Sequence, residues 1–95
     1  MIQPIVGRVV LVRRPGNITG QPEAAFIAYV HSDRMINVGG FDANGQPFGV
    51  TSVQLLQEDD VSHGGTTAEW MPYQKGQAAK TEELERSIKE GFTKP

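Results

Sequence analysis

Two histidines and three aspartates are the residues of this chain that could carry acid–base or metal chemistry. His31 and His63 are its only histidines, and Asp33, Asp59 and Asp60 lie close to them in the sequence. Imidazole and carboxylate groups together can bind a metal ion or form an acid–base pair. Their spacing matches no ligand motif, and a run of acidic residues in a loop is usually a solvated surface. We therefore expect neither a metal site nor a catalytic site here.

Nucleophilic and phosphate-binding signatures are missing from the sequence. Ser52, Ser62 and Ser87 lie in no nucleophile-elbow motif, and the absence of cysteine excludes a thiol nucleophile, a thiolate metal site and a disulfide. The glycines of residues 38–41 precede a turn rather than a helix, so they do not form a phosphate-binding loop. These observations predict a protein that is not an enzyme and that has no cofactor.

Basic and aromatic residues point instead to binding. Arg13 and Arg14 begin a long loop, Arg34 closes a turn, and Trp70 and Tyr73 flank the last predicted strand. In small barrels the loop after the first strand and the residues around the fifth often meet on one rim. There, guanidinium groups beside aromatic rings could hold a phosphate and stack a base. We predict a ligand- or partner-binding rim of these five residues; the alternative is that Trp70 belongs to the core and the arginines only solubilise the surface.

Short β-strands are expected to position these residues, because runs rich in β-branched and aromatic residues alternate with turn residues. The predicted strands span residues 5–12, 24–31, 35–41, 48–55 and 69–73. In the first, Val6, Val10 and Val12 share one face, and a bulge at Gly7 would resolve the placement of Arg8 among them. The second is apolar on both faces and is predicted to be central. In the last, Pro72 favours an edge position.

Turn residues connect the strands in a β-meander. Residues 13–22 form a loop, residues 31–34 form a turn, and Asn44-Gly45 supplies the positive φ angles of a tight hairpin. Gly39-Gly40 marks a bend or the close approach of another backbone. Five strands in so short a chain predict a mainly β fold, with the strands closed into a small barrel.

A C-terminal helix is predicted over residues 75–92, with Thr81 as a possible N-cap. Leu84, Ile88 and Phe92 fall on one narrow apolar stripe, which needs a surface to pack on. Because the barrel core is thin as well, we predict a homo-oligomer with this stripe as its interface. The domain boundaries follow: residues 1–74 form the barrel domain, and residues 75–95 form the helix and tail.

Length and composition limit the class of protein. The chain has 95 residues, of which 38% are hydrophobic and 21% charged, so it forms one small domain. Its net charge of −2 argues against general nucleic-acid binding, which relies on many lysine and arginine contacts with phosphate. It has neither a long apolar run nor a signal-peptide start, so a cytoplasmic location without membrane contact is expected.

Three segments carry a resemblance to a known family. Residues 6–10 (VGRVV), residues 24–45 (AAFIAYVHSDRMINVGGFDANG) and residues 69–80, with EWMPYQ and GQAAK, resemble small accessory proteins of tailed bacteriophages and prophages. The resemblance implies an SH3-like small barrel that acts in the cytoplasm of an infected bacterium. It assigns no catalytic residue.

This context favours a binding role in defence evasion. We expect a non-enzymatic accessory protein that sequesters a nucleotide-type immune signal or blocks a host defence protein. The alternatives are a structural adaptor in virion assembly and nucleic-acid binding by the barrel surface.

Overall fold

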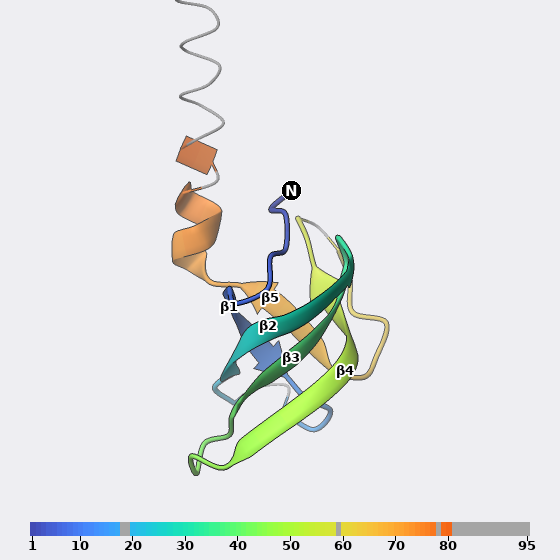
Figure 1. Ribbon diagram of the computed structural model, residues 1–95, viewed down its shortest axis with the longest axis vertical. Helices are drawn as coiled ribbons and strands as arrows, with labels where there is room; N and C mark the ends of the chain where they lie inside the picture. The colour runs from blue at the N-terminus through green and yellow to red at the C-terminus, as the bar shows by residue number, and fades with distance from the viewer. Residues whose placement is uncertain (18–19, 59, 78, 81–95) are drawn as a thin grey trace, which may run out of the picture.

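Five β-strands form a closed barrel in the computed structural model, which describes residues 1–17, 20–58, 60–77 and 79–80 (Figure 1). They are β1 (Val9–Arg13), β2 (Glu23–Ser32), β3 (Met35–Phe41), β4 (Pro47–Leu56) and β5 (Thr67–Trp70). The first four form an antiparallel meander, and β5 closes the barrel by pairing parallel to β4 and antiparallel to β1. The prediction of a mainly β, five-stranded barrel is confirmed.

The core lies inside the barrel and follows the two-residue period of a strand. Each strand contributes two buried hydrophobic residues at alternate positions: Val10 and Val12, Ala25 and Ile27, Ile36 and Val38, Val53 and Leu55, Ala68 and Trp70. Ile2, Val30, Phe48 and Val50 are partly buried and pack against this cluster. The interior is therefore filled by side chains, and ligand space has to lie at the ends or on the outside.

The first strand begins later than predicted. It starts at Val9 rather than at residue 5, because Gly7 has a φ of 96° and the chain turns there. The Gly7 amide donates to the carbonyl of Ile27 at 2.8 Å, which holds this turn against β2. Val6 is 60% exposed, so the prediction that it shares the buried face of Val10 was wrong. The expected bulge at Gly7 is a turn instead.

The composition of the second strand predicts burial on both faces, but one of its faces is exposed. Only its inner face contacts the core, whereas Phe26 is 47% exposed and Tyr29 56% exposed on the outside. The physical reason is that a barrel of one sheet has a single interior, so a strand between two neighbours still presents its other face to solvent. The register shifts after Ile27 and again after Val30, which reorients the end of β2.

The predicted hairpin of β3 and β4 is present, but its turn is not the tight Asn-Gly turn that the sequence predicts. Its turn is held by Asp42, whose amide donates to the Gln46 carbonyl and whose carboxylate accepts from the amides of Asn44 and Gln46, each at 2.9 Å. Of the Asn-Gly pair, only Gly45 takes a positive φ, at 78°. The loop is thus the longer hairpin type, in which one glycine follows an ordinary turn.

The predicted close approach at the paired glycines is confirmed for Gly40. A Cβ on this residue would contact the Ala24 carbonyl oxygen and lie 2.8 Å from the Cα of Ala25. Gly40 therefore lets β2 and β3 approach inside the barrel.

The last strand starts two residues and ends three residues earlier than predicted, and it is not at an edge, since both its neighbours are strands. Pro72 instead begins a helix, seen over residues 72–77 and 79–80, where its fixed φ and missing amide are tolerated. Gln74 accepts from the amide of Met71 at 2.9 Å and donates to the carbonyl of Val9 at 3.0 Å, which fixes the helix start to β1.

The predicted C-terminal helix thus starts at residue 72. Thr81, Leu84, Ile88 and Phe92 lie outside the described residues. The division into residues 1–74 and 75–95 stays a prediction.

Candidate functional site

Two cavities lie at opposite ends of the β1–β5 strand pair. The register joins Val10 to Trp70 at one end and Arg13 to Thr67 at the other. We call them the tryptophan-end cavity, of about 350 Å³, and the arginine-end cavity, of about 400 Å³. Both volumes are within the range of small-molecule sites, so the chemistry of their walls has to distinguish them.

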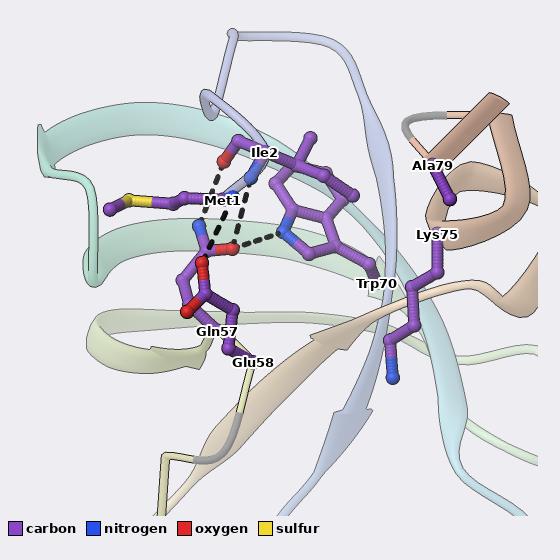
Figure 2. A pocket seen from close by; sticks show the side chains of 7 residues that line it. All are labelled: Met1, Ile2, Gln57, Glu58, Trp70, Lys75 and Ala79. Carbon is purple, nitrogen blue, oxygen red and sulfur yellow. Dashed lines mark hydrogen bonds and ion pairs between the residues drawn. The ribbon is translucent and has the colours of Figure 1, made fainter. Parts of the chain in front are cut away.

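Residues distant in the sequence line the tryptophan-end cavity, as Figure 2 shows: Met1, Ile2, Gln57, Glu58, Trp70, Lys75 and Ala79. Gln57 lies at its centre with only 1% of its surface exposed. Its carbonyl oxygen accepts from the Trp70 indole at 3.1 Å and from the Ile2 amide at 3.3 Å. Its amino group donates to the carbonyls of Ile2 and Asp33 at 2.8 and 3.0 Å. All the hydrogen-bonding capacity of this amide is used within the protein.

Two ion pairs surround this end of the barrel. The Met1 amino group lies 3.0 Å from a carboxylate oxygen of Glu58, and Arg34 Nε lies 2.8 Å from Asp60 Oδ2. The backbone amide of Gln57 also donates to Asp60 Oδ2 at 2.9 Å. This backbone hydrogen bond, together with the one from Arg34, holds the pKa of Asp60 below its usual range. The polar groups named at this end bond to one another, so it is built to hold segments together.

The arginine-end cavity lies between two loops. The last residue of β1 and the loop after it supply residues 13–17, and the loop before β5 with the first residue of that strand supplies Ser62, Gly64, Gly65 and Thr67. Gly16, Gly64 and Gly65 have φ values of 93°, 91° and 72°, a backbone region that favours glycine. Among the described residues, two arginines and no carboxylate line the cavity, so its walls favour an anion.

The two arginines differ in how they are held. Arg14 makes a two-pronged ion pair with Glu23, with both distances 2.7 Å, and its guanidinium lies 4.6 Å from the ring centre of Phe48. The hydrogen bond to Glu23 raises the pKa of Arg14. The positive charge of Arg14 is therefore balanced by Glu23, and its side chain is held in place.

Arg13 lacks such a partner. One of its Nη atoms donates to the Gly20 carbonyl at 2.7 Å. No described carboxylate forms an ion pair with it. Since a guanidinium carries five N–H donors, Arg13 retains both charge and donors for a ligand.

Both loops are braced by side-chain amides. In the first, Asn17 donates to the Gln21 carbonyl at 2.9 Å, and its backbone amide donates to the carbonyl of Arg14 at 3.0 Å. In the second, Gln54 of β4 donates to the Val61 carbonyl and accepts from the His63 amide, both at 3.0 Å. Loops held in this way lose less entropy when a ligand binds.

The five residues of the predicted rim are not brought together. Arg13 and Arg14 line the arginine-end cavity. Arg34 lies at the other end, with its Nη1 4.0 Å from the Met1 sulfur, and Tyr73 is 71% exposed on the helix. Trp70 is 2% exposed and belongs to the core cluster, as the alternative interpretation held.

The histidine and aspartate residues are also dispersed. The ring of His31 bonds to Asn37 at 2.9 Å and lies edge-on to Tyr29, whereas His63 lies in the loop before β5. In the part of the chain that the structure describes, no group of three or more such side chains is placed to hold a metal ion.

Sequence reasoning missed Gln57 and the loop of residues 62–65. Gln57 had a detectable signal, because it continues the inward series of Val53 and Leu55 at a spacing of two. The loop had none, since its proximity to Arg13 follows from the pairing of β1 with β5.

Comparison of the chain with protein-family models, curated proteins and solved structures found no match. Among the described residues, no helix is long and apolar enough to cross a membrane.

Proposed function

We propose that this protein is a non-enzymatic binding protein that holds a small anionic ligand of nucleotide type in the arginine-end cavity. The observation that carries the proposal is Arg13, a guanidinium on the cavity wall whose one hydrogen bond in the described chain is to a backbone carbonyl. A phosphate group would complete its coordination, since guanidinium groups bind phosphate through paired N–H donors.

The rest of the cavity suits the remainder of such a ligand. Ser62 and Thr67 carry hydroxyl groups, and the braced glycine loop allows close approach of a ligand to its backbone. The volume of about 400 Å³ accommodates a nucleotide-sized molecule. Arg14, held by Glu23 and Phe48, supports the wall of the site.

The biological setting of this proposal comes from the resemblance to phage accessory proteins. On that basis the barrel is SH3-like, and the protein acts in the host cytoplasm by sequestering a nucleotide-type immune signal. A sequestering protein needs affinity and no catalytic group, which agrees with the described lining of the site: Arg13 and Arg14, hydroxyl groups and backbone.

Thermal unfolding with a panel of cyclic mononucleotides, cyclic dinucleotides and inorganic phosphate tests the proposal. A ligand present at 100 times its dissociation constant adds about 2.7 kcal/mol of stability, which raises Tm. We expect Arg13→Ala to abolish this increase. Arg8→Ala is the matched control, because it removes the same charge from an exposed position beyond the other end of β1.

Two results would refute the proposal. One is an unchanged Tm of the unmodified protein with every nucleotide of the panel. The other is an increase of equal size in Arg13→Ala and in Arg8→Ala. If the first result came with an increase in Tm for inorganic phosphate, it would assign the cavity to phosphate instead of a nucleotide.

A further inference from the structure

The outside of the barrel carries an apolar surface where solvent-facing strands usually place polar residues. Strand register aligns two rows of outward residues across β1, β2, β3 and β4. One row is Val9, Phe26, Gly39 and Gly49. The other joins the pairs Leu11–Ala24 and Phe41–Pro47, which become neighbours when the Ala25–Gly40 register is extended by one residue on each strand. We call these eight positions the outer apolar face.

The outer apolar face is open to solvent in the single chain. Val9, Phe26 and Phe41 are 42%, 47% and 60% exposed. The Phe26 ring lies over Gly39. A Cβ built on Gly39 would be 3.4 Å from the Cζ atom of Phe26, so aromatic carbon covers the glycine backbone. None of the eight positions carries a charge or a side-chain hydrogen-bonding group. A continuous apolar surface of this kind marks an interaction site.

The helix that follows β5 is poorly packed on its own barrel. Pro72, Tyr73, Lys75 and Ala79 are exposed, and Gln74 ties the start of the helix to Val9, at the border of the outer apolar face. In Figure 1 the helical turns lead away from the barrel. The helix therefore starts beside the face, at Gln74, and is directed away from it.

The sequence beyond residue 80 contains apolar residues that match the outer apolar face in chemistry. Its last fifteen residues contain Leu84, Ile88 and Phe92, spaced at four-residue intervals that form one apolar stripe on a helix. We propose that the outer apolar face binds the Leu84–Phe92 segment of a second copy of this chain. The exchange is reciprocal, so each copy gives one stripe and receives one.

Symmetry makes this exchange large enough to be stable. A reciprocal pair makes the same contact twice, so each contact has to bury only about 600 Å² to reach the roughly 1,200 Å² of a specific interface. Three large apolar side chains against Val9, Phe26 and Phe41 supply that order of area, since one aromatic side chain alone buries about 150–250 Å². This assembly is independent of the ligand proposed above.

The solution mass of full-length variants, measured by light scattering, tests the exchange. We expect the unmodified chain to be a dimer. The face variant Phe26→Asp with Phe41→Asp and the stripe variant Leu84→Asp with Ile88→Asp should both be monomers. Val61→Asp, at a position 74% exposed and away from the face, should stay dimeric. If the double face variant fails to fold by circular dichroism, Phe41→Asp alone serves, because Phe41 is more exposed than Val9 and Phe26.

Mixing the two monomeric variants identifies the occupant of the face. The face variant retains an intact stripe and the stripe variant an intact face, so the mixture should form dimers through a single contact. Because that contact buries only half the area of the reciprocal pair, these dimers should be weaker than those of the unmodified chain, and the mass is measured at high protein concentration. A monomeric unmodified chain would overturn the proposal. A stripe variant that stays dimeric would also overturn it, because two faces would then pack directly on each other. A mixture of the two variants that stays monomeric would overturn it as well.

Discussion

Replacing the buried amide of Gln57 is the sharpest test of what closes the tryptophan end of the barrel. Gln57→Leu keeps the volume of the side chain but removes four hydrogen bonds, which join β4 to Trp70, to Ile2 and to the turn at Asp33. The substitution leaves the partners in place without an amide to bond to. Removing one partner from a buried pair is more costly than removing both.

The magnitude follows from the burial of each partner. The indole N–H belongs to a side chain that is 2% exposed, so water cannot replace Gln57 there, and an unsatisfied buried donor costs about 1–3 kcal/mol. Ile2 and Asp33 are half-buried and can recover bonds to water, so together they add roughly 1 kcal/mol. We expect Gln57→Leu to lower the free energy of unfolding by about 2–4 kcal/mol. In a domain of this size, that corresponds to a Tm lower by about 10–25 °C.

Chemical unfolding followed by fluorescence measures this loss directly, because Trp70 is the single tryptophan of the chain. Gln54→Leu is the matched control: Gln54 lies on β4, which ends just before Gln57, and bonds to the exposed residues Val61 and His63, so its loss should cost less than about 1 kcal/mol. Trp70→Phe, read by circular dichroism, should combine with Gln57→Leu less than additively. If Gln57→Leu unfolds within about 0.5 kcal/mol of the unmodified protein, the reasoning fails.

Two further substitutions test the close approach of β2 and β3 at Gly40 and the ion pair between Arg34 and Asp60. Gly40→Ala should destabilise the protein by about 1–3 kcal/mol, because the new Cβ meets the β2 backbone. Gly49→Ala is the control: the nearest contact of its new Cβ is at 3.7 Å, so it should change stability by less than about 1 kcal/mol. Equal denaturant midpoints for the two variants would contradict the close approach of β2 and β3 at Gly40. Asp60→Asn should lower Tm at pH 7. Since the folded pKa of Asp60 is lowered, its carboxylate stabilises the fold above the unfolded value of about 3.9, and that contribution disappears as pH falls through the folded value. The Tm difference between Asp60→Asn and the unmodified chain should therefore shrink in acid, and a difference that is constant with pH would exclude this role.

The middle of the fold could be predicted from sequence because local signals agree there. The third strand was predicted at residues 35–41 and is found there, between polar turns that bound it on both sides. The outer strands were less accurate. Residues 5–8 and 71–73 are rich in residue types that favour strands, but Gly7 and Pro72 turn the backbone away from its neighbours.

The candidate site was predictable only in part. Arg13 and Arg14 were identified by charge and by their place in a long loop, and both line the arginine-end cavity. Arg34 and Trp70 were assigned to the same rim, but the register of β1 with β5 places Trp70 at the other end. Which residues meet across a barrel depends on pairing between segments more than fifty residues apart, and no local pattern contains that information.

That distant pairing also sets the order in which the protein can form during its synthesis. β2, β3 and β4 pair with neighbours in sequence, so their hairpins need only short loops to close. β1 finds β2 early, but its other edge stays open until Thr67–Trp70 has been made. For most of translation, the strand Val9–Arg13 exposes unpaired amides and carbonyls beside valine and leucine. An open apolar strand edge of this kind can pair with other chains, so the nascent protein is most vulnerable to aggregation just before its fifth strand emerges.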